Sequence, residues 1–352
     1  MLATHSTAAA DPNSAVSIPE LPLSWRDIVA PVQPFLWAVA ERLSAQVDAF
    51  EPEIVPHARY AVSSQGKQLR PALVGLSGEA VGVLNDDHVT VATIIEMVHL
   101  ATLVHDDVAD AAEMRRRRPT LAVQCGTATS VLLGDCLFAH ALTLAASFPT
   151  PDICRAVALA TRTVCTGEII QTERPADFDL SREHYFRVLQ MKTAELFALS
   201  CELGARLSGA GREEQEALRA YGVALGTAYQ VHDDCVDLFG DELRAGKSLG
   251  TDLVAGKLTL PLLVGLERAS GAERRGLEAL LREWRPDQLE ELRGWLHRTG
   301  ALTESARVIG EFCQTAQAAL DDLPPSAGRR ALAWAADYLA RQTEALAASA
   351  GG

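Results

Sequence analysis

The sequence lacks the features by which redox proteins, nucleic-acid-binding proteins and covalent hydrolases are usually found. Its seven cysteines form no CxxC pair and no metal-ligand spacing, which is typical of small buried residues in a reducing compartment. Its net charge of −14 offers no basic surface to phosphate backbones, so we expect no nucleic acid partner. No motif suggests a Ser-His-Asp or Cys-His arrangement, so a nucleophilic side chain is not expected.

Export and membrane signals are also missing. The first 22 residues have neither a basic start nor an apolar core, so they predict no signal or transit peptide. They are rich in Ala, Ser and Pro, which indicates a disordered tail over 1–22 ahead of one domain over 23–350. The most apolar stretch, 131–148, contains Asp135 and His140 and falls short of an uninterrupted span of about 20 residues. We therefore expect a buried core helix there, no transmembrane segment and a cytoplasmic protein.

Helical periodicity dominates the rest of the chain, and alternating β-patterned runs are absent. Apolar residues recur at three- and four-residue intervals, and Gly, Pro, Asp and Asn cluster at the breaks. The predicted helices are 24–49, 53–64, 69–83, 87–110, 126–146, 152–174, 182–207, 212–240, 257–268, 272–283, 286–298, 302–321 and 326–347. No break is long enough to be an interdomain linker. With 352 residues and 48% hydrophobic content, the sequence predicts one all-α domain with a large core.

The pentad Asp-Asp-x-x-Asp occurs twice, in VHDDVAD and VHDDCVD. Residues i and i+4 share a helix face, so Asp106 pairs with Asp110 and Asp233 with Asp237. Two carboxylates about 4 Å apart repel by roughly 4 kcal/mol at an effective dielectric of about 20. A chain that has two such carboxylate pairs within apolar segments is expected to bind cations there. Hard oxygen ligands without Cys or paired His favour Mg²⁺. The alternative is two solvated acidic helix faces.

Several candidate cations occur before, between and after the two pentads in the sequence. Lys67 and Arg70 open a predicted helix, where the helix dipole favours a bound anion over a basic pair. His99 lies two turns before the first pentad on a similar face. The others are Arg115, Arg116, Lys192, Lys247 and Lys257. Singly these are ordinary surface or core residues, but together with two acidic clusters they predict a pocket for two polyphosphates, one bound through metal and one directly.

The order of these motifs resembles the trans-isoprenyl diphosphate synthase (polyprenyl synthetase) family. The similarity runs from about residue 65 to 261, with closing helices to about 339. The matching segments are GKQLRP, EMVHLATLVHDDVAD, RRRRPT, VLLGDCLFA, GEIIQ, MKTAELF, AYQVHDDCVDLFGD and GKSLGTDLVAGKLTLPLL. The resemblance implies a single-domain bundle of long helices around a deep central cavity, with the pentads facing each other across its mouth. It also implies a homodimer.

The resemblance further implies a role for each matching residue. The pentad aspartates would hold Mg²⁺, about three ions per active site, bridging the allylic diphosphate: Asp106, Asp107, Asp110, Asp233, Asp234 and Asp237. The residues that would contact the allylic diphosphate are Arg115, Lys192, Thr193, Gln230, Lys247 and Lys257. Those that would bind isopentenyl diphosphate are Lys67, Arg70, His99 and Arg116. The six aspartates and Lys192 are the expected catalytic residues.

Two positions depart from the family's pattern. Arg117 stands where Arg-Arg-Gly-x-Pro-Thr has its glycine, which predicts an altered turn. Ser248 replaces a common proline after Lys247. Neither change removes a charged ligand, so we expect an active enzyme.

The implied reaction lengthens a prenyl chain. Loss of diphosphate from the allylic substrate, stabilised by Mg²⁺ and cationic side chains, generates a carbocation to which the alkene of isopentenyl diphosphate adds. Ala101 and Thr102, about one turn before the first pentad, are small where farnesyl-forming relatives usually carry aromatic residues. Met97, one turn further, is a candidate floor. These residues predict a medium- or long-chain product of hexaprenyl to decaprenyl size.

Other functions compatible with the motifs are a short-chain (farnesyl or geranylgeranyl) diphosphate synthase, a class I terpene cyclase, a non-catalytic partner subunit and a helical scaffold. A cyclase usually has a different second acidic motif and has no need of Lys67, Arg70 and His99. Partner subunits typically lose a pentad, whereas both are intact here. A scaffold predicts no Mg²⁺-dependent stabilisation by diphosphates.

Overall fold

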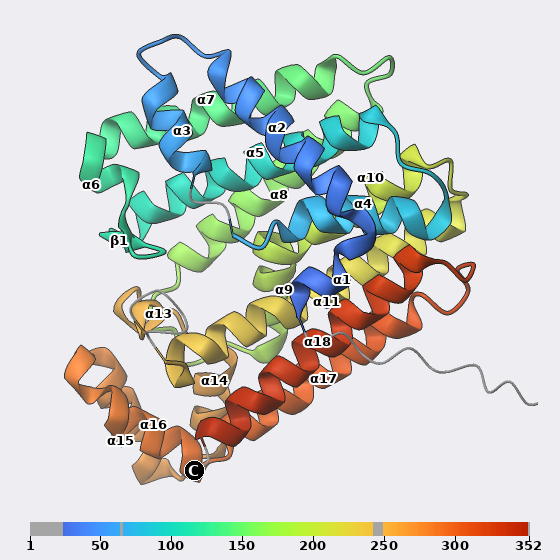
Figure 1. The fold of residues 1–352 in the computed structure, drawn as a ribbon. Helices are drawn as coiled ribbons and strands as arrows, with labels where there is room; N and C mark the ends of the chain where they lie inside the picture. The colour runs from blue at the N-terminus through green and yellow to red at the C-terminus, as the bar shows by residue number, and fades with distance from the viewer. Residues whose placement is uncertain (1–23, 64–65, 242–248, 351–352) are drawn as a thin grey trace, which may run out of the picture.

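The computed structural model describes residues 24–63, 66–241 and 249–350, which form helices joined by short connections (Figure 1). The predicted tail over 1–22 and Lys247 lie outside these residues. The elements up to the middle of the chain are α1 Trp25–Ile28, η1 Ala30–Val32, α2 Gln33–Asp48, α3 Val55–Val62, α4 Leu69–Val81, α5 Asp86–Ala109, β1 Met114–Arg115, β2 Arg118–Pro119, α6 Leu121–Cys125, α7 Thr127–Ala146 and α8 Asp152–Thr172. Those that follow are α9 Arg182–Leu189, η2 Gln190–Ala194, α10 Glu195–Leu207, α11 Arg212–Phe239, α13 Thr251–Val254, α14 Leu260–Arg268, α15 Gly271–Arg282, η3 Pro286–Gln288, α16 Leu289–Arg298, α17 Ala301–Ala318 and α18 Ala327–Ala350. The predicted all-α domain is confirmed.

Helix α5, which ends in the first pentad, is surrounded by other helices. Asn85 caps its start, because the Asn85 side chain accepts a hydrogen bond from the N–H of His88 and the His88 ring accepts one from the N–H of Asn85. Capping of this kind satisfies donors that the first turn leaves unpaired. The helix packs against α2, α4, α7 and α10, and Met97 and Ala101 have no exposed surface. The acidic end of α5 is therefore held by a rigid core.

Helix α11, which carries the second pentad, is held from several sides. It packs against α10, α17, α18 and η2. Tyr221 donates a hydrogen bond from its hydroxyl to the Leu332 carbonyl at 2.7 Å, and the His232 ring lies 2.9 Å from the Thr343 hydroxyl. Helices α17 and α18 run side by side, whereas α15 and α16 lie at the end of the molecule opposite α7 (Figure 1). The C-terminal helix thus fixes the helix of the second pentad.

Short irregular elements interrupt some of the predicted helices. The predicted helix 182–207 is divided by η2, a π-helical turn, and an antiparallel pair of two-residue strands, β1 and β2, follows α5. The turn between these strands places Arg116 at φ 51° and Arg117 at φ 62°. A left-handed backbone conformation costs an L-residue roughly 1–2 kcal/mol. The turn nevertheless has this conformation at Arg117, the position where the family's pattern has glycine. Such details depend on tertiary contacts rather than periodicity.

Helix α7 differs from the prediction of a buried core helix over 131–148. Both α5 and α7 are long and apolar enough to cross a membrane by length and composition, a test that core helices also pass. Of the most apolar 18-residue segment of each helix, 72% is buried in the protein in α5 and 33% in α7. Leu132 is 64% exposed and Val131 is 36% exposed. The prediction was wrong for one face of α7, because hydropathy cannot tell a face covered by the same chain from one that is left open.

Candidate active site

The first pentad lies at the C-terminal end of α5, where each carboxylate has a cation or a polar cluster as its neighbour. Asp107 is buried and accepts a hydrogen bond from Nε of Arg115 at 2.8 Å. Asp110, the C-cap residue, accepts from Nζ of Lys257 at 2.9 Å and 3.0 Å. A helix C-terminus carries partial negative charge, so acidic side chains there need compensation. These two cations supply it, and Lys257 joins the first pentad to the segment after the second.

Asp106 faces a polar cluster built around Lys192. Nζ of Lys192 forms an ion pair with Oε1 of Glu168 and donates to Oε1 of Gln171 at 3.0 Å. Burial, followed by the charge of Glu168, raises the pKa of Asp106 to about 7. Burial lowers the pKa of Lys192, but Glu168 and Asp106 outweigh it, so this pKa is raised and the ammonium stays charged. Lys192 is therefore the cation of this cluster, and it faces both Glu168 and Asp106.

A π-helical turn brings Lys192 to this position. Lys192 and Thr193 lie in η2, and π-helical turns are often found at functional sites. Gly167 of α8 lets this turn approach closely, because a Cβ there would lie 2.9 Å from both the backbone N of Lys192 and the Cβ of Met191. Real Cβ atoms essentially never make contacts this short, so a larger residue would force the turn or α8 to shift. Gly167 thus places the neighbouring Glu168 against Lys192.

The second pentad is buried and engaged in hydrogen bonds. Asp234 accepts from the Tyr185 hydroxyl at 2.6 Å and from Nε2 of Gln230 at 2.8 Å. Burial, and to a smaller degree Asp252, raises the pKa of Asp234 to about 8 despite these bonds. Asp237 accepts from the Thr251 hydroxyl at 3.0 Å and from the N–H of Asp252 at 3.2 Å. Asp233 of the same pentad is only half-buried.

The donor chemistry of the two pentads fits Mg²⁺. The side chains provide hard carboxylate oxygens, and burial, followed by neighbouring acidic groups, raises the pKa values of Asp106 and Asp234, an effect that a bound cation would oppose. Among the described residues, no three His, Cys, Asp or Glu side chains already form a group that could hold a metal ion. The residues that would hold Mg²⁺ are the pentad aspartates, of which Asp107, Asp110, Asp234 and Asp237 accept hydrogen bonds from protein donors in the free protein.

Four residues predicted to bind isopentenyl diphosphate come from three segments. The Arg70 guanidinium lies 5.1 Å from the centre of the Phe197 ring, and Nζ of Lys67 lies 5.7 Å from that of Tyr338. The Arg116 guanidinium packs on Gly66, where a Cβ would lie 2.5 Å from it. Burial, then the charges of Arg70, Arg115 and Arg116, holds the pKa of His99 well below its ordinary value. Arg70 and Arg116 thus act on His99 beside the first pentad, whereas Lys67 lies over Tyr338 and acts on His232, next to the second pentad.

Two open pockets border the pentads. One, of about 400 Å³, is lined by Asp107 and Arg115 together with Leu100, Leu103 and Val104 of α5. The other, of about 360 Å³, is lined by Lys257, Gln171 and Tyr185 together with apolar residues of α8 and α9. Both place charged side chains beside apolar ones.

Comparison with known proteins agrees with this geometry. Residues 51–296 match the family model of Polyprenyl synthetase. The chain belongs to the polyprenyl synthetase family. Octaprenyl diphosphate synthase of Escherichia coli K12 is 35% identical over 274 residues, which are 78% of this chain and 85% of that protein. Nonaprenyl diphosphate synthase of Mycobacterium tuberculosis H37Rv is 37% identical over 276 residues, 78% of this chain and 82% of that protein.

A solved structure shares the whole fold. The crystal structure of polyprenyl synthase from Caulobacter crescentus CB15, complexed with calcium and isoprenyl diphosphate, superposes with a TM-score of 0.86 at 33% identity. The match covers 90% of this chain and 97% of that one. The family and the prenyltransferase class predicted from the motifs are therefore confirmed.

The sequence motifs predicted no role for three residues that contact Lys192 or the second pentad. Glu168 and Gln171 belong to the GEIIQ segment, which was matched as a motif but was given no role. Tyr185 had no motif at all, and only the fold brings its hydroxyl to Asp234. Thr193 and Gln230 were predicted separately, and the structure joins them by a hydrogen bond of 2.8 Å. Of the residues predicted to set chain length, Met97 and Ala101 are fully buried, and Thr102 donates to the His99 carbonyl at 2.7 Å.

Proposed function

We propose that this chain is a Mg²⁺-dependent prenyltransferase that condenses an allylic diphosphate with successive isopentenyl diphosphates into an all-trans medium- or long-chain polyprenyl diphosphate. The observation that carries the proposal is the set of cations at the first pentad, where Arg115 pairs with Asp107, Lys257 pairs with Asp110 and Lys192 acts on Asp106. The turn that carries Lys192 also reaches Asp234 of the second pentad, through Thr193 and Gln230. Cations that neutralise carboxylates in the free protein are placed to hold phosphate oxygens once a metal occupies those carboxylates. Octaprenyl- and nonaprenyl-forming relatives support the product class.

Different residues of this chain would bind each of the two diphosphates. Arg115, Lys192 and Lys257 would bind the allylic diphosphate as it leaves and stabilise its charge. Lys67, Arg70, His99 and Arg116 would hold isopentenyl diphosphate with its alkene about 3–3.5 Å from the allylic carbon. Mg²⁺ supplies further charge neutralisation to the leaving group when it is bound. The departed diphosphate would accept the proton, so no dedicated side-chain base is required.

The product channel would run along α5 away from the pentad. Ala101 is small and buried, and it lies five residues before Asp106. A small residue leaves room for a growing chain, whereas a bulky one would stop it. Met97 would then lie deeper along the channel, one further turn from Asp106. The alternative function is a short-chain synthase in which Met97 closes the channel.

We also propose that the enzyme is a cytoplasmic homodimer without a transmembrane segment. Exposed apolar residues lie on the packed helices α7 and α8: Val131, Leu132, Leu159 and Ile169. An exposed apolar face of this kind is typical of an interface, and a second copy would cover it. Leu132→Glu should convert a dimer into a monomer in light scattering after gel filtration. A wild-type monomer would contradict the dimer.

One incubation tests the function. Purified protein is given labelled isopentenyl diphosphate and farnesyl diphosphate with Mg²⁺, and the dephosphorylated products are separated by chromatography. We expect polyprenols of hexaprenyl to decaprenyl size, and none after addition of EDTA. Geranylgeraniol alone would favour the short-chain synthase, a cyclic hydrocarbon would favour a cyclase, and no product would favour a non-catalytic subunit.

A further inference from the structure

One arginine closes the end of α11 directly after the second pentad. The last carbonyls of an α-helix have no donor within the helix and carry partial negative charge. At the end of α11, the Asp237 carbonyl accepts a hydrogen bond from the N–H of Gly250 at 2.9 Å. The carbonyls of Leu238 and Gly240 both accept from Arg293, through its Nε at 2.6 Å and its Nη2 at 3.0 Å. A single cationic side chain therefore holds two carbonyls of this helix end.

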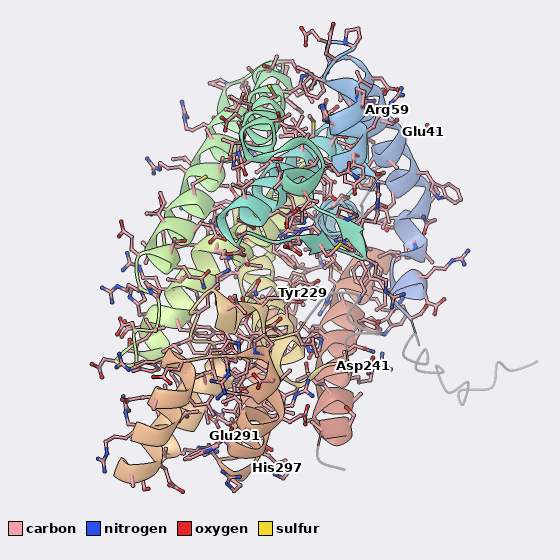
Figure 2. All side chains as sticks on the ribbon, turned by 90° about the vertical axis from the view of Figure 1, so that its left-hand side faces the viewer. Glu41, Arg59, Tyr229, Asp241, Glu291 and His297 are labelled. Atoms are coloured by element: carbon pink, nitrogen blue, oxygen red, sulfur yellow. The ribbon has the colours of Figure 1, made fainter. Side chains whose placement is uncertain are left out.

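Arg293 belongs to a helix to which neither the motifs nor the proposed mechanism gives a role. It lies on α16, 55 residues after Leu238, and α16 packs against α11. In Figure 2, Tyr229 of α11 lies near the middle of the molecule, Asp241 beyond the end of that helix lies lower, and Glu291 of α16 lies lower still. Helix α16 thus meets α11 at the end that carries the pentad.

The guanidinium of Arg293 has a fixed direction. Its Nη1 donates to Oε1 of Glu290 at 2.5 Å, but that carboxylate is 81% exposed, whereas the Arg293 side chain is 25% exposed. A surface ion pair of this kind contributes little. The two carbonyl bonds, which a planar guanidinium donates in set directions, are therefore the contacts that fix α11 against α16.

Asp237 is held from the other side as well. Its side chain accepts from the Thr251 hydroxyl and from the N–H of Asp252, and its carbonyl from the N–H of Gly250. Helix ends fray unless their groups are bonded, and the second pentad occupies the last two turns of α11. The segment 250–252 and Arg293 together hold the turn that carries Asp237.

We propose that Arg293 is a positioning residue, which keeps the aspartates of the second pentad in the orientation that binds Mg²⁺ together with a diphosphate. The inference rests on the proposed function, because it takes the metal-bound diphosphate as the ligand of this pentad. It also makes a prediction about sign. A cation near an acidic metal site weakens metal binding by its charge alone, so its removal would strengthen binding. Removal of a positioning cation weakens metal binding instead.

The test compares the full-length wild type with Arg293→Gln, which removes the guanidinium and keeps a polar side chain. Arg329→Gln is the matched control. Arg329 of α18 donates to the carbonyls of Leu323 and Asp321 at 2.6 Å and 3.1 Å, beyond the end of α17. Its side chain is 28% exposed, close to the value for Arg293. The turn before it packs on the C-terminal part of α4, a helix without pentad residues.

The main measurement is the Mg²⁺ requirement for stabilisation by a diphosphate. Each protein is heated with inorganic diphosphate at one fixed concentration and with increasing Mg²⁺. The Mg²⁺ concentration that gives half of the rise in melting temperature is recorded. Complex formation between Mg²⁺ and diphosphate in solution is the same for all the proteins, so a difference belongs to the protein. This measurement needs no turnover, and hydrogen exchange of the Gly240 amide reports on the last turn of α11.

For Arg293→Gln we expect the half-saturating Mg²⁺ concentration to rise about tenfold, the lower end of the loss typical when a group that orients metal ligands is removed. The Gly240 N–H, which donates to the Val236 carbonyl, should exchange faster. Both glutamine variants should lower the melting temperature without metal by a similar amount, but Arg329→Gln should keep the Mg²⁺ requirement of the wild type. An unchanged or lower Mg²⁺ requirement in Arg293→Gln overturns the inference. So does an equal rise in both variants, which a merely structural role produces.

Two further outcomes separate this inference from the proposed function. A wild type that Mg²⁺ and diphosphate stabilise but that makes no product contradicts the proposed activity, while the half-saturating Mg²⁺ concentrations still decide the role of Arg293. A wild type that they do not stabilise contradicts both. If Arg293→Gln fails to fold, Arg293→Lys keeps the charge but loses the planar fork, and we expect its Mg²⁺ requirement to rise about threefold. An unchanged requirement in that variant overturns the positioning role.

Discussion

Lys192 and Thr193 are adjacent in one π-helical turn, yet they reach different pentads. Nζ of Lys192 pairs with Glu168 beside Asp106 of the first pentad. The Thr193 hydroxyl donates to Gln230, which donates to Asp234 of the second. In a regular α-helix, neighbouring side chains diverge by about 100°. Because the two neighbouring side chains diverge, one short segment contacts both acidic groups, and it lies close to Gly167 of α8.

Gly167→Ala should disturb this turn. The added Cβ would lie 2.9 Å from the backbone N of Lys192, so the turn has to move away from α8. Overpacking of this kind costs about 1–3 kcal/mol, and the displaced Lys192 should raise the allylic KM more than the isopentenyl KM. Steady-state kinetics and chemical denaturation measure both effects.

Gly310→Ala is the matched control for that variant. Gly310 lies inside α17, and a Cβ there would meet nothing within 4 Å. Replacing a helical glycine by alanine should stabilise the protein by about 0.5–1 kcal/mol without a change in kinetics. If Gly167→Ala behaved like Gly310→Ala, the close approach would have no functional importance.

The pentads should be more important for turnover than for folding. Asp106→Ala and Asp233→Ala should lower kcat by orders of magnitude, because each is proposed to hold a metal ion against the allylic diphosphate. Asp106→Ala should keep or raise the melting temperature, since burial and Glu168 already oppose its charge. Asp237→Ala should instead destabilise the fold by about 1–3 kcal/mol, because Thr251 and the N–H of Asp252 would lose their acceptor. Turnover near that of the wild type in either of the first two variants would contradict the two-pentad mechanism.

The long helices could be predicted from the sequence because they depend on local patterns, whereas the ligand roles of the charged residues come from the family's motifs and stay predictions. Helix α5 needed only its apolar residues and the Asn85 cap. The π-helical turn at Lys192 could not be predicted, because it follows from a contact between α8 and η2 that brings together residues distant in the sequence. The hydrogen bonds that occupy Asp234 and Asp237 were missed for the same reason. Periodicity reports which face of a helix is buried, but not which partner meets it.

Isopentenyl diphosphate binding should take up a proton at His99. Burial, with the charges of Arg70, Arg115 and Arg116, depresses the pKa of His99, so the imidazole is neutral in the free enzyme at pH 7. A bound diphosphate brings negative charge to the same ring and should raise that pKa. Affinity should therefore increase as the pH falls through the raised pKa of His99 in the complex, and level off below its depressed pKa in the free protein. Calorimetry at pH 6 in two buffers of different ionisation enthalpy measures the protons taken up.

His99→Gln provides the control for that measurement. The ionisation of the free diphosphate contributes equally to both proteins, so the difference between them isolates the imidazole. The depressed pKa also links His99 to stability: its contribution is present above about pH 6.5 and is lost as the pH falls toward the folded-state pKa. The glutamine variant should lose that part of the pH dependence. Equal proton uptake by the two proteins would make His99 a core residue without a role in binding.

Product length should respond to a change at Ala101. This residue is fully buried on α5, five positions before Asp106, so a growing chain that follows the helix should pass it. Ala101→Phe adds a ring to a close-packed region that has no spare volume for both the ring and a long prenyl tail. The charged residues of the site are untouched, so the first condensations should proceed and later ones should stop. We therefore expect farnesyl- or geranylgeranyl-sized products at a turnover close to that of the wild type.

Met97→Ala tests the same channel from its deeper end. Met97 lies one helical turn beyond Ala101 and is fully buried. Removing most of its side chain adds space below the ring position, so the product should keep its length or become longer. Chromatography of the dephosphorylated products distinguishes these outcomes, with the melting temperature as a check that each variant folds. A wild-type chain length from a folded Ala101→Phe variant would mean that the prenyl chain does not pass this turn. The small residues before the first pentad would then no longer support a long-chain product.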